Sequence, residues 1–273
     1  AGARWGSLPT LAIAQVTSLI LLLLLGLATQ GRVPIAPEVA PQAALYGVLA
    51  SVAYISMFAG LAIGPISVVS PAVAAYGGLT VILAVVLLGE TVAPLQWLGA
   101  AIGTVGVALT AFRFDGANRT ARPVSRGVLL AIVSLVLFAG VTVGLVAPIR
   151  EAGWLDVVFV SRLANAAVVW ALLIGVRRFR PRGSAVLLGP SGGSGRRAAW
   201  MLPLIGVLDV GGFIAYAVGL EVSLAWIVGL ASSFGPAVAV MVAVGFLGER
   251  LRAVQWLGLA AIAFGLVLVA VPG

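Results

Sequence analysis

The chain has 273 residues, of which 62% are hydrophobic and only 9% are charged. A soluble domain carries about a quarter charged residues, so this composition excludes an ordinary soluble protein. All 16 basic residues are arginines and the chain has no histidine or cysteine, which excludes thiol chemistry, disulfides and the usual zinc ligands. The net charge of +8 comes from arginines in the gaps between apolar segments, as in cytoplasmic loops of membrane proteins, so we expect no nucleic-acid partner.

Charge-free apolar stretches of about 20 residues are long enough to cross a bilayer as helices. In chain order, nine such spans are predicted near 8–30, 42–63, 65–88, 93–113, 127–149, 155–176, 199–220, 224–248 and 254–271. These stretches are continuously apolar, whereas a transmembrane barrel needs alternating apolar and polar residues. We therefore expect an all-α, multi-pass protein of the inner cell membrane.

The sequence repeats itself at an offset of 159 residues. The Gly-Glu pair at 89–90 recurs at 248–249, and Gln-Trp-Leu-Gly at 96–99 recurs at 255–258. Apolar residues match by chance easily, but a shared glutamate, glutamine and tryptophan at one offset do not. The chain is therefore predicted to be a duplication.

The repeat divides the chain into a first copy at 1–113, a basic connecting loop at 114–126 and a second copy at 127–273. The span near 127–149 has no counterpart, so we expect five helices in the second copy and four in the first, whose leading helix is absent. An odd number of helices makes the two copies insert with opposite orientations. Inverted repeats place a binding site near the bilayer midplane and permit alternating access.

The residues of the repeat carry a family resemblance. A Gly-Glu that closes an apolar helix, followed by Gln-Trp-Leu-Gly, resembles the EamA family of the drug/metabolite transporter superfamily. In that pattern a proline precedes the glutamate by 13 positions, as Pro236 precedes Glu249. The first copy departs from the pattern, because Gly77 occupies the matching position and its proline lies earlier, at Pro71.

The resemblance covers essentially the whole chain. It implies a ten-helix fold in its complete form and secondary active transport of a small solute, such as an amino acid, another metabolite or a drug, commonly as efflux. Transport would be proton-coupled or exchange-driven, would need no cofactor or metal, and would be carried out by a monomer or a weak homodimer in the lipid bilayer. The alternatives are a channel or an intramembrane enzyme without histidine, cysteine or lysine chemistry, and we expect no enzyme.

Two arguments about membrane orientation disagree. Thirteen arginines fall on one side of the predicted topology and two on the other, which places the C-terminus outside by the positive-inside rule. The family resemblance implies that both ends of the ten-helix form lie in the cytoplasm.

Asp209 is the only charged residue predicted to lie deep within a span. A charge there costs roughly 3 kcal/mol or more unless it faces a cavity or a partner. It is interpreted as a contact for a solute cation or as a proton carrier, with a structural hydrogen bond or a pair with an intramembrane arginine as the alternative. Phe213 and Tyr216 follow on a similar face and are expected to line a site for an organic cation.

Small and aromatic residues near helix-breaking prolines are the other candidate solute contacts. Ser232 and Ser233 precede Pro236 in the second copy, while Tyr54 and Tyr76 lie in the first copy. They are predicted to line the solute cavity, or else to serve helix packing alone.

A third set is predicted to be structural. Glu90 and Glu249 lie just before new helices, where a carboxylate can bind free backbone N–H groups, and Gln96 and Gln255 are expected to bridge the same turns. Arg162 is expected either to pair with Asp156 or to extend toward the membrane interface.

Overall fold

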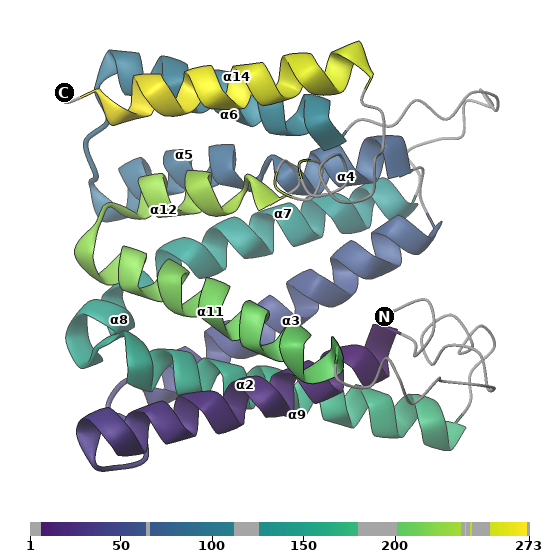
Figure 1. Ribbon diagram of the computed structural model, residues 1–273, viewed down its shortest axis with the longest axis vertical. Helices are drawn as coiled ribbons and strands as arrows, with labels where there is room; N and C mark the ends of the chain where they lie inside the picture. Colours follow the sequence, from purple (N-terminus) through teal and green to yellow (C-terminus); the bar gives the residue numbers. More distant parts are fainter. Residues whose placement is uncertain are drawn as a thin grey trace. The chain divides into compact units, whose positions relative to one another are not determined.

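The computed structural model describes residues 7–63, 66–111, 126–179, 201–235, 238, 241 and 252–271. All regular secondary structure in these ranges is helical, which confirms the expected all-α class. The helices, labelled in Figure 1, are α2 (Ser7–Gln30), α3 (Ala40–Ile63), α4 (Ile66–Ala74), α5 (Tyr76–Leu88), α6 (Pro94–Ala111), α7 (Arg126–Gly144), α8 (Val146–Ala152), α9 (Trp154–Phe179), α11 (Met201–Val222), α12 (Ala225–Ser232) and α14 (Ala253–Ala270).

Apolar composition and length make many of these helices suited to a bilayer, where every backbone polar group must bond within the helix. Within the described ranges, six segments are long and apolar enough to cross a membrane: Ala12–Gln30, Ala40–Leu61, Val69–Leu88, Arg126–Ala152, Trp154–Phe179 and Ala253–Ala270. The protein is therefore a multi-pass membrane protein.

Two predicted spans are interrupted. The first divides into α4 and α5 at Ala75, one turn after Pro71, and the second divides into α7 and α8 at Leu145. Proline has no backbone N–H and its ring clashes with the carbonyl four residues earlier. For Pro148 that carbonyl belongs to Gly144, the last residue of α7.

The helices pack as two compact units. The first unit comprises residues 1–51 and 145–221, and the second comprises 52–144 and 222–273. Each unit therefore contains residues of both sequence copies. When the first-copy residues of a unit are shifted by 159 positions, they largely coincide with the second-copy residues of the same unit. The packing units cut across the predicted repeats.

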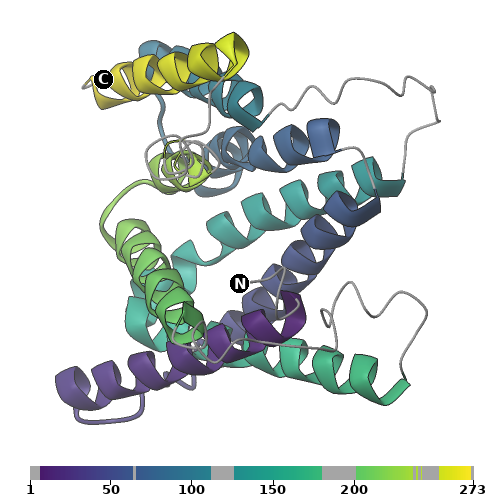
Figure 2. The same ribbon diagram turned by 45° about the vertical axis from the view of Figure 1, so that its right-hand side comes forward.

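In the second unit, α6 and α14 lie side by side (Figures 1 and 2). Their observed bounds differ by 159 residues at both ends. Glycines bring the two backbones together: a Cβ on Gly106 would lie 2.8 Å from the Gly258 carbonyl oxygen, and one on Gly99 would lie 2.7 Å from the Gly265 oxygen. Because later residues of α6 meet earlier residues of α14, the two equivalent helices run antiparallel.

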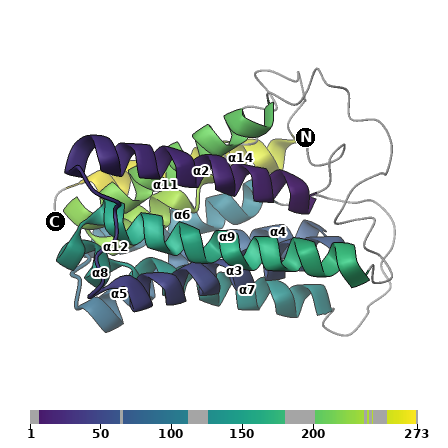
Figure 3. The same cartoon turned by 90° about the horizontal axis from the view of Figure 1, so that it is seen from below.

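In the first unit, α2 packs along α9 (Figure 3) through Ala12, which contacts Val169 and Leu173. Helix α11 approaches α2 at Gly206, where an added Cβ would lie 2.9 Å from the Ala14 carbonyl oxygen. Asp209 lies about one turn after Gly206 and so shares its face. This close approach positions Asp209 beside α2 and α9.

Candidate solute-binding clusters

Asp209 has an arginine partner within the first unit. Nη1 of Arg162, on α9, lies 2.8 Å from Oδ2 of Asp209, on α11. The atoms are at ion-pair distance without the angle of a directed hydrogen bond. The Arg162 side chain is 6% exposed and that of Asp209 is 38% exposed, so the arginine is the enclosed member of the pair.

Arg162 has further contacts on neighbouring helices. Its Nη1 donates a hydrogen bond to Oε1 of Gln15 at 3.4 Å, and its guanidinium carbon lies 4.1 Å from the ring centroid of Phe213. That distance is within the range of a cation–π interaction. The Phe213 and Tyr216 rings lie 5.5 Å apart. Arg162 thus already contacts the carboxylate and the ring face at which an organic cation was expected to bind.

Three buried polar atoms of this cluster have no hydrogen-bond partner among the described residues. They are Oδ2 of Asp209, which meets Arg162 at ion-pair distance, Nε of Arg162, and Oδ1 of Asn165, three residues later on α9. Arg162 and Asn165 are each 5% exposed. Unpartnered buried groups are rare in native proteins and call for an explanation such as a water or a ligand.

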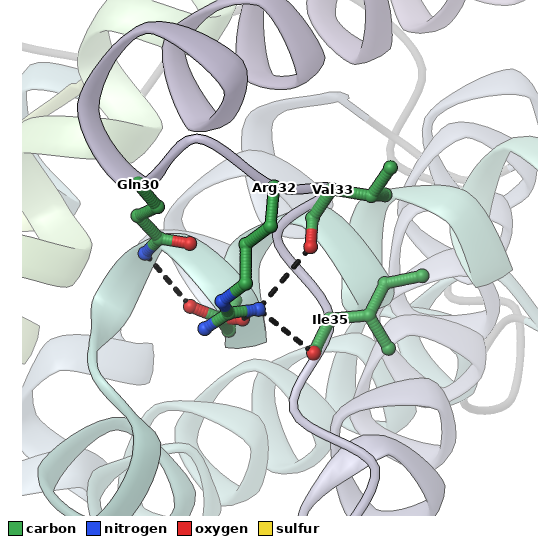
Figure 4. Close-up of polar contacts among 5 residues, drawn as sticks. Gln30, Arg32, Val33 and Ile35 are labelled. Atoms are coloured by element: carbon green, nitrogen blue, oxygen red, sulfur yellow. Dashed lines mark hydrogen bonds and ion pairs between the residues drawn. The ribbon is translucent and has the colours of Figure 1, made fainter.

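Asp156 is paired elsewhere, so the expected pair between Arg162 and Asp156 is wrong. Arg32 donates from Nη1 to Oδ1 of Asp156 at 2.7 Å, and Gln30 donates from Nε2 to Oδ2 at 2.9 Å. The same Nη1 donates to the carbonyl oxygens of Val33 and Ile35, at 3.2 and 2.9 Å (Figure 4). This clasp joins the α2–α3 loop to the first turn of α9.

Two acids at the ends of helices are more enclosed by packing than Asp209. Asp156 is 1% exposed and Glu90 is 8% exposed, both less than Asp209. Both lie at helix ends in the sequence, where burial depends on which helix packs over them. Periodicity along one helix does not reveal that packing.

The second unit contains an aromatic cluster. The rings of Tyr54 (α3) and Phe138 (α7) have centroids 4.9 Å apart in an edge-on arrangement, and Tyr76 (α5) lies 5.6 Å from Phe138. The Tyr76 hydroxyl donates a hydrogen bond to Oγ of Ser232 at 3.0 Å. Tyr54, Tyr76 and Ser232 thus lie together within one unit. Phe138 contacts both tyrosines, and Tyr76 binds Ser232.

Ser233 has a different environment from Ser232. It is 1% exposed, and its hydroxyl donates to the Leu230 carbonyl oxygen at 2.7 Å. A Cβ on Gly77 would collide with its side chain, so Ser233 packs directly against α5. Ser232 is therefore the serine of this pair that contacts the aromatic cluster.

Phe138, Gln15 and Asn165 are not among the residues expected at the site, and the partner expected for Arg162 differs from the observed one. Phe138 lies on α7, a helix without a counterpart in the first copy, so the repeat comparison gave no signal for it. The polar residues were detectable as rare polar groups inside apolar spans.

Glu90 binds a helix N-terminus from the other sequence copy. Its Oε1 accepts from the Ala225 backbone N–H at 2.8 Å and its Oε2 accepts from the Trp226 N–H at 3.1 Å, at the start of α12. The carboxylate thus contacts the start of α12, which lies far from Glu90 in the sequence.

The two equivalent glutamines close the starts of their own helices. Oε1 of Gln96 accepts from the Ala93 N–H at 3.0 Å, and Oε1 of Gln255 accepts from the Arg252 N–H at 3.1 Å. Pro236 and Glu249, predicted as partners of these motifs, lie outside the described residues.

Within the part of the chain that the structure describes, no cluster of three acidic residues is arranged to hold a metal ion.

Comparison with known proteins adds a family and a fold. The model of the EamA-like transporter family matches residues 1–112 and again residues 125–271. No curated protein matches the chain. A solved structure described only as the crystal structure of a protein is 20% identical, with a TM-score of 0.73, over 98% of this chain and 89% of that one.

That structural likeness supports the fold alone, whereas the family model covers nearly the full length in two successive matches. The fold is the membrane fold of drug/metabolite-type transporters. The chain belongs to the EamA-like transporter family.

Proposed function

We propose that this chain is a secondary active transporter of the inner membrane that exports a small metabolite or drug. It works by alternating access, driven by protons or by exchange, as expected for inverted repeats. The observation that carries the proposal is the Arg162–Asp209 ion pair within apolar helices of an EamA-like chain. Ionisable groups inside membrane helices are costly and usually mark a solute or ion pathway.

Both clusters are proposed to contact the solute. Asp209, Phe213 and Tyr216 contribute from the first unit. Tyr54, Tyr76, Ser232 and Ser233 contribute from the second unit, with Ser233 holding α12 against α5. Rings beside a charged or hydroxyl group suit a solute with an apolar body and a polar group.

The test is uptake into proteoliposomes from a panel of labelled metabolites, with and without a pH gradient. We expect uptake of at least one solute above that of protein-free liposomes. Asp209→Asn should reduce this uptake about tenfold and abolish its response to the gradient, because an amide can neither carry a proton nor pair with Arg162 when the solute leaves.

Glu38→Gln is the matched control, since it removes an exposed acid of the first unit. It should transport like the wild type. Uptake no greater than in empty liposomes would contradict transport itself. An Asp209→Asn variant with wild-type uptake and pH response would contradict only the role of Asp209.

A further inference from the structure

We propose that Arg162, with Asn165, forms a subsite for a carboxylate or similar singly charged oxyanion of the solute, which takes the place of Asp209 on the guanidinium. The inference rests on the proposed transport function and specifies the charge of the solute group at this cluster. Four observations carry it: the unused donor of Arg162, the unused amide oxygen of Asn165, the unequal burial of the ion pair and the occupied face of Phe213.

Arg162 has unused donor capacity. A guanidinium has five N–H donors in a planar fork that matches a carboxylate with two parallel hydrogen bonds. In this structure Nη1 serves both Asp209 and Gln15, while Nε, which points along a different edge, has no partner among the described residues. Among the described residues, the guanidinium therefore has an unpartnered donor at Nε for a solute oxyanion while Gln15 stays bound at Nη1.

Asn165 supplies an adaptable neighbour. Residues three apart lie on neighbouring positions of one helix face, so Asn165 is on the Arg162 side of α9. Its amide oxygen has no hydrogen bond to lose within the described residues. The amide can turn over to offer its two N–H donors to an anion, since its two orientations have nearly the same shape.

The unequal burial of the pair determines which member can leave. Arg162 is 6% exposed, so its charge needs an anionic partner wherever Asp209 goes. Asp209 is 38% exposed, so it is the member of the pair with open space beside its side chain. Exchange of Asp209 for a solute carboxylate keeps the arginine paired throughout.

A cation lacks this route. The groups that would attract it, the Asp209 carboxylate and the Phe213 ring, already contact Arg162. An incoming cation would also lie close to the guanidinium and be repelled by it. The geometry therefore favours an anionic group over an organic cation at this cluster.

The test compares three probes of similar shape and different charge: benzoate, benzamide and benzyltrimethylammonium. Binding to the purified full-length protein in nanodiscs is measured by calorimetry. We expect benzoate to bind at least tenfold more tightly than either of the other two. Asp209→Asn should tighten benzoate binding severalfold, because the competing carboxylate is gone while Arg162 stays charged.

Single variants of a buried ion pair can fail to fold, so the decisive variant is Arg162→Gln combined with Asp209→Asn, which removes both charges together. This double variant should fold and lose benzoate binding. Arg32→Gln combined with Asp156→Asn is the control, because it removes both charges of the other Arg–Asp pair of the first unit and should leave benzoate affinity unchanged.

The proposal is overturned if benzamide or benzyltrimethylammonium binds the wild type as tightly as benzoate, or if the folded double variant retains benzoate binding. Neither result would argue against transport measured in proteoliposomes, which a neutral or cationic solute can satisfy. Benzoate binding without any solute uptake would instead contradict the proposed function and leave the subsite supported.

Discussion

Each enclosed acid in the described part of the chain has a specific partner. Asp156 is bound by Arg32 and Gln30, Asp209 by Arg162, and Glu90 by two backbone N–H groups. Burying a carboxylate without a partner would cost roughly several kcal/mol of hydration free energy. The rarity of charge in this sequence therefore reflects how few such partners the apolar helices offer.

Glu90→Ala should destabilise the protein. The substitution leaves the Ala225 and Trp226 N–H groups at the start of α12 without an acceptor, and loss of a helix cap costs about 1–2 kcal/mol. Unfolding in a denaturing-detergent titration measures the change. Glu38→Ala removes an exposed acid and should cost less than about 0.5 kcal/mol; an equal loss in both variants would contradict the capping role.

Sequence reasoning identified Asp209, Phe213 and Tyr216 because a charge in an apolar run stands out on its own. The pairing of Arg162 with Asp156 was wrong, because the observed partner, Asp209, lies on another helix. Gly206 allows α11 to approach α2, which itself packs along α9, the helix of Arg162. Which helix face meets which neighbour depends on packing between distant segments, and one sequence without its relatives does not contain that information.

At the scale of helices, small residues determine which elements can touch. In a bilayer, lipid is as apolar as the helices, so association depends on close packing instead of the hydrophobic effect. The glycines of α6 and α14 provide that packing. Helix positions were predictable because continuous apolar runs locate them. The breaks at Ala75 and Leu145 were not, because the apolar runs continue through both; the second lies where the Pro148 ring meets the carbonyl four residues earlier.

Gly106→Ala should separate α6 from α14. The new methyl group would lie 2.8 Å from both the Gly258 carbonyl oxygen and the Ile262 nitrogen, which are backbone atoms that cannot move alone. Overpacking of this kind costs about 1–3 kcal/mol. The free energy of unfolding reports it.

Gly140→Ala, on α7 of the same unit, is the control. No atom lies within 4 Å of the added Cβ, so the variant should be neutral or up to about 1 kcal/mol more stable through higher helix propensity. Equal stability of the Gly106 and Gly140 variants would show that the glycine contact is not tight.

For the whole molecule, the duplication and the packing are related in an unexpected way. The copies found in the sequence are consecutive, yet each compact unit combines helices from both. The sequence predicted the family and the helical class, both of which are confirmed. It did not predict that helices of the two copies pack together in each unit, because a match between residues 159 positions apart in the sequence says nothing about their distance in space.

The antiparallel contact of α6 and α14 predicts which residues face opposite sides of the membrane. Thr91 and Ala253 are exposed residues at the N-terminal ends of these two equivalent helices. The chain has no native cysteine, so single-cysteine variants carry a unique label site. In sealed vesicles, a membrane-impermeant maleimide should label Thr91→Cys and Ala253→Cys from opposite sides; labelling of both from one side would contradict the antiparallel arrangement.

The paired glycines of α6 and α14 also bear on ancestry. Gly99 meets Gly265, which is the counterpart of Gly106, and Gly106 meets Gly258, which is the counterpart of Gly99. That reciprocity is the mark of a contact between two identical subunits. A half-length ancestor assembling with its own twin would have carried every charge twice. In one fused chain the copies can differ, as they do where Asp209 corresponds to Ala50, 159 residues earlier, so a single chain can hold an asymmetric pathway.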